Sequence, residues 1–260
     1  MGYADELFDL TDRVVLITGG SRGLGREMAF AAARCGADVI IASRNLESCQ
    51  ATASEIIAET GRAALAYQVH VGRWDELDGL VDAAYDEFGK VDVLVNNAGM
   101  SPLYESLGSV PEKLFDAVVN LNFKGPFRLS ALVGERMVAD GGGSIVNVSS
   151  TGSLRPDPHM LPYAAAKAGL DQVVRVAAIE FGPRGIRVNA VSPGPVGTGI
   201  LERSMPADAA RAFLDQMAAG NPMRRLGEPE EIARAIAFLG FDATFATGVE
   251  LAVDGGVTQL

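Results

Sequence analysis

The hydrophobic residues of this chain follow two patterns that alternate along its length. Short runs rich in β-branched residues are each followed by a turn and then by a longer stretch with apolar residues at helical spacing. This order is typical of a parallel sheet whose strands are joined by crossover helices. The strands are expected at residues 13–18, 38–43, 63–70, 91–96, 144–149, 186–192 and 250–253, and the helices at residues 24–35, 46–60, 74–88, 111–139, 162–181 and 228–239. The pattern therefore predicts an α/β fold, a doubly wound parallel sheet of about seven strands with helices on both faces.

The whole chain, residues 1–260, is expected to form one domain. With 48% hydrophobic residues it can bury a large core, and α/β domains of this size often remain single. No linker, low-complexity segment or short-period repeat interrupts it. The regular alternation breaks at about residues 199–222, where a short stretch mixes apolar and polar residues. We interpret this segment as a mobile substrate lid.

The charge and the cysteine content argue against several classes of protein. The formal net charge is −11, and Lys and Arg do not cluster, which disfavours a nucleic acid partner. No apolar run reaches the roughly 18 residues that span a bilayer, and the first residues are acidic where a secretion signal is basic. Cys35, Cys49 and the two histidines have no metal-binding spacing. We expect a cytoplasmic protein with no metal site and no membrane contact, whose cysteines are reduced packing residues.

A glycine-rich loop joins the first expected strand to the first expected helix, in the run Thr18-Gly-Gly-Ser-Arg-Gly-Leu-Gly25. Glycines at this junction let the backbone turn sharply and approach a ligand, while the helix amino terminus offers free N–H groups to a pyrophosphate. A strand before the loop and a helix after it indicate a Rossmann-type dinucleotide site. The candidate cofactor-binding residues of the loop are Gly19, Ser21, Arg22, Gly23, Leu24 and Gly25.

The end of the second expected strand favours NADP(H) over NAD(H). A site selective for NAD usually has a carboxylate here, which binds the ribose hydroxyls and repels the 2′-phosphate of NADP. This chain has Ser43 followed by Arg44. Arg44 and Arg22 are suited to clamp the phosphate with charge-assisted hydrogen bonds, although both are also open to interpretation as solvated loop arginines. NADP(H) is therefore the predicted cofactor.

Tyr163 and Lys167 lie four residues apart in an alanine-rich stretch, which places both side chains on one face of the expected helix. Free tyrosine titrates near 10, and one cation about 4 Å away supplies about 4 kcal/mol at an effective dielectric constant near 20. That is enough to bring a tyrosine pKa toward neutral pH. Such pairs are usually ordinary surface contacts, but beside a dinucleotide site this one indicates a proton donor and acceptor.

With these motifs the chain resembles the short-chain dehydrogenase/reductase family, over residues from about Leu10 to Gly256. The family's runs are matched by Asn96-Asn97-Ala98-Gly99, by Asn122-Phe-Lys-Gly125, by Pro193-Gly-Pro-Val-Gly-Thr198 and by the closing Val253-Asp-Gly-Gly256. The resemblance implies an enzyme that moves a hydride between the cofactor and a carbonyl or alcohol. It implies the catalytic residues Asn122, Ser150, Tyr163 and Lys167. Further cofactor contacts are implied for His70, Val71, Asn97, Ala98, Gly99, Tyr163, Lys167, Pro193, Gly194, Val196 and Thr198.

The resemblance also assigns roles to the catalytic residues. Tyr163 exchanges a proton with the substrate oxygen, and Ser150, thirteen residues before it, hydrogen-bonds the same oxygen. Lys167 lowers the pKa of Tyr163 and holds the nicotinamide ribose, and Asn122 positions a water molecule that links Lys167 to solvent. His70 departs from the family pattern, which often has Asp there to accept from the adenine amino group. A neutral imidazole is also able to accept, so His70 is kept as a cofactor contact, with packing as the alternative.

The substrate class stays open at this point. The residues expected near the pocket are mostly apolar, which favours a hydrophobic ketone or acyl chain. They are Leu154, Pro158, Met160, Leu161, Ile200, Leu201, Met205, Phe213 and Met217. Reductases of 3-oxoacyl thioesters share the overall pattern, but residues 139–143 carry no cation to dock an acidic carrier protein, and only Arg184 is nearby. The opening residues 7–13 resemble sugar-acid and polyol dehydrogenases, in which Arg155 or Arg203 would face a carboxylate.

Two further expectations concern the class of protein and its assembly. A protein that binds NADP without turnover, as a sensor or scaffold, is the alternative from another class, and the four filled catalytic positions argue against it. The helices expected at 111–139 and 162–181 carry more apolar residues than one sheet-facing stripe requires. In related enzymes these helices pair across a two-fold axis, so we expect a homotetramer.

Overall fold

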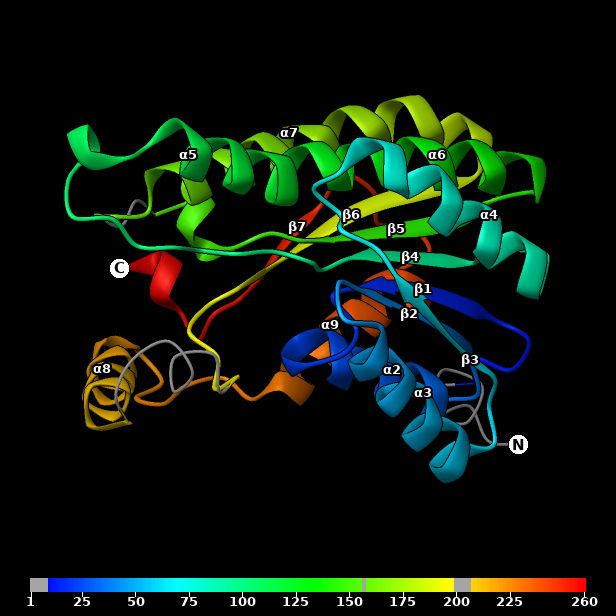
Figure 1. The fold of residues 1–260 in the computed structure, drawn as a ribbon, viewed down its shortest axis with the longest axis horizontal. Helices are drawn as coiled ribbons and strands as arrows, with labels where there is room; N and C mark the ends of the chain where they lie inside the picture. Colours follow the sequence, from blue (N-terminus) through cyan, green and yellow to red (C-terminus); the bar gives the residue numbers. More distant parts are fainter. Residues whose placement is uncertain (1–8, 156–157, 199–206) are drawn as a thin grey trace.

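In the part of the chain that the structure describes, seven parallel strands form one sheet in the order β3-β2-β1-β4-β5-β6-β7 (Figure 1). This structure is a computed structural model, and it describes residues 9–155, 158–198 and 207–260. The strands are β1 Val14–Thr18, β2 Asp38–Ser43, β3 Ala64–Gln68, β4 Val93–Asn96, β5 Gly143–Val148, β6 Ile186–Pro193 and β7 Glu250–Val253. The chain runs outward from β1 to β3 and then returns to β4 on the other side of β1. The predicted doubly wound α/β fold is therefore confirmed.

The helices cover both faces of this sheet, as Figure 1 shows. One face carries α4, α5, α6 and α7, and the opposite face carries α2, α3 and α9. Their bounds are α2 Gly23–Arg34, α3 Leu46–Thr60, α4 Leu77–Phe88, α5 Glu112–Val119, α6 Gly125–Ala139, α7 Leu161–Phe181, α8 Ala207–Gly220 and α9 Pro229–Ala237. None of the helices in the described ranges is both long and apolar enough to cross a membrane.

The core consists of two layers, one on each face of the sheet. Along β1 the side chains alternate, because Val15 and Ile17 pack against α2 and α9 while Val14 and Leu16 pack against the helices of the other face. All five residues of β1 are buried. A central strand covered on both faces must be apolar at every position, which explains the continuous hydrophobic run in the sequence.

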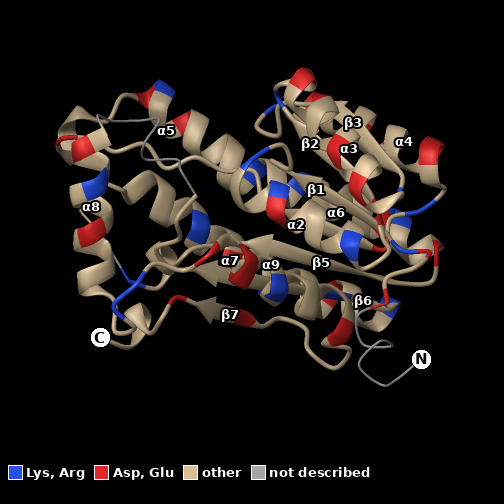
Figure 2. Ribbon diagram, turned by 90° about the horizontal axis from the view of Figure 1, so that it is seen from below, with Lys and Arg blue, Asp and Glu red and all other residues tan. Residues whose placement is uncertain are grey.

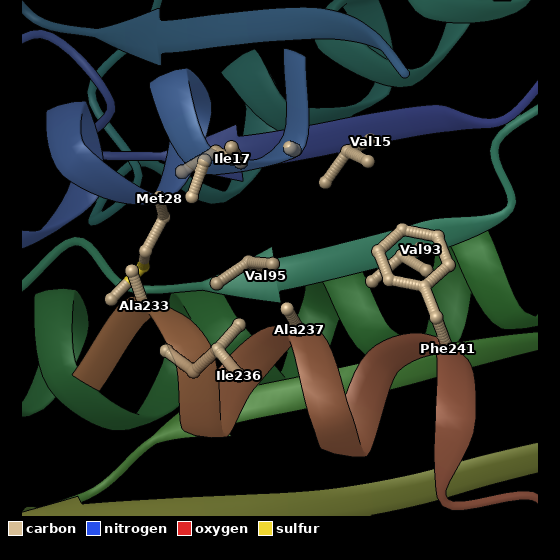
Figure 3. A pocket seen from close by; sticks show the side chains of 11 residues that line it. Val15, Ile17, Met28, Val93, Val95, Ala233, Ile236, Ala237 and Phe241 are labelled. Atoms are coloured by element: carbon tan, nitrogen blue, oxygen red, sulfur yellow. The ribbon is translucent and has the colours of Figure 1, made fainter. Parts of the chain in front are cut away.

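A small cavity of about 20 Å³ remains in one core layer (Figure 3). It lies between β1, β4, α2 and α9, and its walls include Val93, Ala233, Ile236 and Phe241. A void of this size holds at most one water molecule, and its apolar lining offers a water molecule no partners. It is therefore a packing defect of the core, separate from any ligand site.

The long helix expected at 111–139 is divided in the structure. A π-helical turn, Asn120–Lys124, stands between α5 and α6. A π turn inserts one extra residue and changes the direction in which the following side chains point, and such turns often occur at functional sites. The chain is nevertheless helical from residue 112 to residue 139, close to the expected bounds, and the π turn within this stretch holds Asn122, one of the candidate catalytic residues.

The expected lid segment lies only partly within the described residues. Residues 199–206 fall outside them, and residues 207–220 form α8. Figures 1 and 2 both place α8 at the end of the molecule where α5 lies, apart from the sheet. Of its residues only Ala210 is buried. This helix is thus held by few contacts, unlike the helices that cover the sheet.

Candidate active site

The candidate functional residues follow the carboxyl ends of the central strands, which meet at one edge of the sheet. The glycine loop follows β1, Asn97 follows β4, Ser150 follows β5 and Gly194 follows β6. Strands β1 and β4 are neighbours, yet the chain leaves them toward opposite sides of the sheet. In open α/β sheets such a switch point is where ligands bind.

The glycine loop has no room for side chains where it meets the sheet. Gly19 and Gly23 have φ values of +68° and +52°, which favour glycine. A Cβ atom on Gly25 would lie 2.3 Å from the carbonyl oxygen of Gly19 and 2.6 Å from Nδ2 of Asn97. The first turn of α2 has no acidic residue, and Arg22 before it makes no capping hydrogen bond through its side chain. The N–H groups of this turn are therefore available to an anion, so the loop fits a dinucleotide pyrophosphate.

The glycine loop is held in place by Thr18, the last residue of β1, together with Asn97, which follows β4. The Asn97 side chain donates to the carbonyl of Thr18 at 2.9 Å. The hydroxyl of Thr18 accepts from the N–H groups of Asn97 at 3.0 Å and Ala98 at 3.1 Å. The sequence analysis named Asn97 and Ala98 as cofactor contacts, whereas Thr18 stood only as the first residue of the glycine-rich run.

The end of β2 presents hydroxyls and no carboxylate. The hydroxyl oxygens of Ser21 and Ser43 lie 2.9 Å apart, and Ser43 Oγ lies 3.0 Å from Sγ of Cys49. Arg22 and Arg44 are exposed, and neither forms an ion pair within the described ranges. Both cysteines are free thiols, and Cys49 is fully buried. The end of β2 therefore has no carboxylate that would repel a phosphate group at the surface beside Ser43.

His70 uses one ring nitrogen within the protein. Its Nδ1 accepts from the N–H of Gly72 at 3.1 Å, so the neutral ring carries its proton on Nε2. The backbone N–H of His70 donates to Glu76 at 2.8 Å. In this arrangement the remaining ring nitrogen, Nε2, is a donor, and the contact of His70 with the cofactor stays a prediction. Val71, the next residue, is buried beside Gly125.

Tyr163, Lys167 and Ser150 come together at the start of α7. Lys167 is buried, and its Nζ donates to the carbonyl of Val148 at 2.6 Å and lies 5.8 Å from the centre of the Tyr163 ring. The hydroxyl of Ser150 accepts from the N–H of Gly152 at 3.0 Å. A Cβ atom on Gly152 would lie 3.4 Å from Ser150 Oγ and 3.8 Å from Cε1 of Tyr163. The side chains of Ser150 and Tyr163 are thus close neighbours across a glycine.

The protonation of this pair differs from the sequence-based expectation. Loss of hydration raises the pKa of Tyr163, and the charge of Asp171 raises it further, while a hydrogen bond with Ser150 acts in the opposite direction. Burial lowers the pKa of Lys167 to about 8, and Asp171 opposes that change. The lowered tyrosine pKa expected from the Tyr–Lys spacing is wrong for this structure, because the spacing reveals the cation but not the cost of desolvating the phenolate.

Asn122 is fully buried at the π turn, and both N–H groups and one lone pair of its side chain are hydrogen-bonded. Its Nδ2 donates to the carbonyls of Met100 and Val118, both at 2.9 Å, and its Oδ1 accepts from the N–H of Met100 at 3.2 Å. A Cβ atom on Gly99 would lie 2.7 Å from Asn122 Oδ1 and 3.8 Å from Lys167 Nζ. Only a glycine therefore separates the candidate asparagine from the candidate lysine.

The segment after β6 crosses from the sheet to the glycine loop. The N–H of Gly194 donates to the carbonyl of Val253 at 3.0 Å, and Val196 forms a bridge with Gly227. A Cβ atom on Gly23 would lie 3.8 Å from Cβ of Thr198. Pro193, Gly194, Val196 and Thr198 therefore lie on the path that closes the candidate cofactor site from the side of β6.

Two residues that the sequence did not single out belong to this region. The phenol oxygen of Tyr104 accepts from the N–H of Leu161 at 3.2 Å. The backbone carbonyl of Tyr104 accepts from Nδ1 of His159 at 3.0 Å. Asp171, on α7, influences the pKa of both Tyr163 and Lys167. Asp171 follows Lys167 by four residues, a signal that could have found it, whereas nothing in the sequence pairs Tyr104 with Leu161.

Two arginines, Arg155 and Arg203, were expected to face an acidic group of the substrate. Arg155 donates to the carbonyl of Val257 at 2.9 Å, which ties it to the carboxyl-terminal turn. Arg203 lies outside the described residues. Arg184, which was considered for docking an acidic carrier protein, forms an ion pair with Glu135 at 3.0 Å. Within the described ranges, no group of three or more His, Cys, Asp or Glu side chains is arranged to hold a metal ion.

A glycine loop at the switch point of a doubly wound sheet, with a serine after β5 and a tyrosine and a lysine beside it at the start of α7, defines a nucleotide-dependent oxidoreductase. The chain belongs to the short-chain dehydrogenase/reductase family. The family model described as Enoyl-(Acyl carrier protein) reductase matches residues 19–258.

Relatives of known activity and structure match almost the whole chain. An L-rhamnose 1-dehydrogenase (NAD(P)(+)) of Azotobacter vinelandii is 39% identical, over 95% of this chain and 97% of its own. A 3-oxoacyl-[acyl-carrier-protein] reductase of Synechocystis sp. is 37% identical, over 96% and 98%. The crystal structure of a short-chain type dehydrogenase/reductase from Mycobacterium marinum superposes with a TM-score of 0.89 at 32% identity, over 97% and 98%. The protein is therefore an oxidoreductase acting on alcohol or carbonyl groups, in a family that uses NAD or NADP.

Proposed function

We propose that this protein transfers a hydride between NADP(H) and a ketone or a 3-oxoacyl-type compound, or the corresponding secondary alcohol. The observation that carries the proposal is the convergence of Ser150, Tyr163 and Lys167 beside the switch point, with Asn122 next to Lys167 across Gly99. The nicotinamide supplies the hydride in reduction and accepts it in oxidation.

Each side chain has a role in this proposal that its surroundings support. Tyr163 gives its phenolic proton to the carbonyl oxygen in reduction, and Ser150 donates a hydrogen bond to the same oxygen as negative charge develops. Burial raises the pKa of Tyr163, so the phenol is protonated at neutral pH and has a proton to give. Lys167 holds the ribose hydroxyls with its ammonium group. Asn122 positions a water molecule that returns protons to Lys167.

The catalytic assignment is tested by Tyr163→Phe, which removes only the oxygen that exchanges the proton. Turnover is expected to fall between about 100-fold and 10,000-fold, with NADPH affinity changed less than about threefold. Tyr85→Phe is the matched control, because Tyr85 hydrogen-bonds Asp140 at the far end of the sheet. If Tyr163→Phe retained a tenth of normal turnover, the assignment would be wrong.

The cofactor preference rests on the end of β2 and on the glycine loop. The proposed NADP(H) contacts there are Gly19, Ser21, Arg22, Gly23, Leu24, Gly25, Ser43 and Arg44. Arg22 and Arg44 are exposed, and each directly follows one of the two serines whose hydroxyls meet at the end of β2, which supports a site for the 2′-phosphate. NADP(H) is expected to bind at least about tenfold more tightly than NAD(H), a difference of about 1.4 kcal/mol.

Titration of both cofactors against the protein measures this preference. Arg44→Asp is expected to reverse it, because the new carboxylate repels the phosphate and accepts from ribose hydroxyls. Arg211→Asp, the same change on the surface of α8, is expected to leave it unaltered. Equal affinities for the two cofactors in the unmodified protein would contradict the proposal.

An apolar substrate is supported by the side chains around the start of α7 and on α8. Leu154, Leu161 and Phe213 are 49%, 52% and 40% exposed, so their side chains present apolar surface that an apolar substrate would cover. The second candidate substrate class is a sugar or polyol, favoured by the similarity to the L-rhamnose dehydrogenase. A panel of ketones, 3-oxoacyl thioesters, sugars and polyols with both cofactors separates the two, and no turnover on any of them would favour a non-catalytic NADP-binding protein.

We also infer a substrate lid at about residues 199–222 and a cytoplasmic homotetramer with no nucleic acid or membrane partner. The lid is supported by the sparse packing of α8. Assembly is supported by apolar side chains on the outer surfaces of α6 and α7, where Phe127, Val176 and Ile179 are 45%, 52% and 75% exposed. Light scattering at micromolar concentration is expected to give about four times 27.2 kDa, and a stable monomer would contradict it.

A further inference from the structure

Asp171 is a buried carboxylate that none of the proposed catalytic roles uses. It lies on α7, one turn after Lys167 and two turns after Tyr163, so the three side chains share one face of the helix. Its exposed fraction is 4%, and its Oδ1 has no hydrogen-bond partner among the described residues. A carboxylate in such a place is costly unless a positive charge or hydrogen-bond donors stand nearby.

Two hydroxyls face this carboxylate from the segment that follows β5. Ser149 and Ser153 are both close enough to lower the pKa of Asp171. Ser149 Oγ and Asp171 Oδ1 are both buried, and neither has a hydrogen-bond partner of normal geometry among the described residues. Ser149 adjoins Val148, whose carbonyl accepts from Lys167 at 2.6 Å. The lysine and the carboxylate are therefore anchored to the same strand end.

A second acidic residue lies behind Ser153. Glu250, on β7, accepts from Ser153 Oγ at 3.4 Å and from Ser192 Oγ at 2.7 Å. Its Oε2 lies 3.6 Å from the guanidinium of Arg175, at the surface. Glu250 thus has its own cation and its own donors. Asp171 has neither a partner arginine of its own nor a complete set of donors.

The charges that act on Asp171 come from its own helix and from β7. Burial raises its pKa, the hydroxyls of Ser149 and Ser153 lower it, Glu250 raises it and Arg175 lowers it. On its own helix, Asp171 raises the pKa of both Lys167 and Tyr163. Lys167 is thus the buried cation nearest to Asp171 along the helix, and the loss of hydration acts to remove its proton.

We propose that Asp171 is a positioning residue whose buried negative charge keeps Lys167 in its ammonium form and directed at the strand end after β5. This inference rests on the proposed function for its catalytic consequence, because an ammonium group has three N–H donors, enough for the Val148 carbonyl and two ribose hydroxyls, whereas a neutral amine has two. The charge state of Lys167 is, however, measurable without turnover.

The measurement exploits the small number of lysines in the chain. The sequence contains four, Lys90, Lys113, Lys124 and Lys167, so protein labelled with ¹³C at lysine Cε gives four side-chain signals. Lys167→Arg identifies the signal of Lys167 by its loss. In Asp171→Asn the midpoint of the Lys167 titration is expected to fall by about half a pH unit or more, because the attraction that favours the charged form is gone. An unchanged midpoint in a folded Asp171→Asn protein would overturn the proposal.

Three further variants separate a charge effect from a packing effect. Glu180→Gln removes one carboxylate from an exposed position of the same helix and is expected to leave the midpoint unchanged. Asp171→Glu, which keeps the charge, is expected to restore most of the shift. Where the buried amide of Asp171→Asn prevents folding, Asp171→Leu replaces it with an apolar side chain of similar volume and is expected to give the same lowered midpoint.

The pH dependence of the reaction gives a second readout. In Asp171→Asn the loss of kcat/KM at high pH is expected to begin at lower pH, with KM for NADPH rising there while kcat near pH 6.5 falls less than about threefold. If the unmodified protein reduces no carbonyl compound, the proposed function fails, and the lysine titration still decides the role of Asp171.

Discussion

The two ends of the candidate site are built in different ways. At the cofactor end, α2 buries six residues against the sheet, and the glycine loop is held by backbone contacts that leave no space for a Cβ atom. At the opposite end, α8 buries only Ala210. The cofactor end is therefore fixed by the core. The proposed substrate end is instead formed by side chains on a loosely packed helix. Changes at the first end should affect both stability and binding, and changes at the second should affect binding alone.

Gly25→Ala should give the largest effect, because it adds a single carbon where the glycine loop touches the sheet. The new Cβ would lie 2.3 Å from a backbone oxygen, so the loop or α2 must move. We expect NADPH affinity to fall at least about 100-fold and the free energy of unfolding to fall by about 2–3 kcal/mol. Fluorescence titration and urea denaturation measure the two quantities. Gly108→Ala, where nothing lies within 4 Å of the added atom, is the control and should change neither.

The buried lysine between the two ends predicts a pH dependence of stability. The pKa of Lys167 is about 8 in the folded protein and 10.5 for the free side chain, so the unfolded chain binds more protons between these values. The folded protein therefore gains stability relative to a Lys167→Met variant as the pH rises through this window, by about 2 kcal/mol between pH 7 and pH 10. Urea denaturation of both proteins at each pH measures the difference. If the stability of the unmodified protein relative to Lys167→Met did not rise between pH 7 and pH 10, the lowered pKa of the buried lysine would be contradicted.

Phe213→Ala tests the loosely packed end. Phe213 is 40% exposed on α8, so its removal should change the free energy of unfolding by less than about 0.5 kcal/mol. KM for an apolar substrate is expected to rise about tenfold, which corresponds to about 1.4 kcal/mol, while NADPH affinity stays the same. Arg211→Ala, on the same helix, is the matched control. A loss of stability comparable to that of Gly25→Ala would remove the contrast between the two ends.

Val93→Ile should give the smallest effect, at the cavity shown in Figure 3. The added methylene group enters a void of about 20 Å³, and burial of one methylene contributes about 0.8 kcal/mol. We expect the free energy of unfolding to rise by about 0.5 kcal/mol with no change in kinetics, as measured by urea denaturation. A destabilised variant would mean that the neighbouring side chains, Phe241 among them, already leave too little space.

Most of the fold was predictable because strands that are buried on both faces of a sheet appear in the sequence as continuous hydrophobic runs. The helix at 46–60 and the strand at 250–253 lie where the pattern placed them, and most other boundaries moved by one or two residues. The π turn at Asn120–Lys124 was not predictable, because one inserted residue barely alters the apolar spacing of a long helix. The helix α8 was interpreted only as a break in the rhythm, since a helix with one buried residue has a weak apolar stripe.

The candidate site was predictable where it depends on strand ends. Motifs that follow β1, β4, β5 and β6 must converge, because parallel strands end at one edge of the sheet. What could not be predicted depends on distances across the fold. The pKa of Tyr163 is raised by burial, which the sequence alone does not show. Nδ1 of His70 accepts a hydrogen bond within a turn that the sequence does not reveal. The contact of Tyr104 with Leu161 joins residues 57 positions apart.

The brace between Thr18 and Asn97 has a consequence for the order of events during synthesis. The residues of the glycine loop leave the ribosome early, but the side chain and N–H groups that hold it come from residues 97 and 98, nearly eighty positions later. Strand β4 must also pair with β1 before those groups are in place. A nascent chain is therefore expected to gain affinity for its dinucleotide only after β4 has emerged and folded back, so that cofactor binding reports completion of the first half of the sheet.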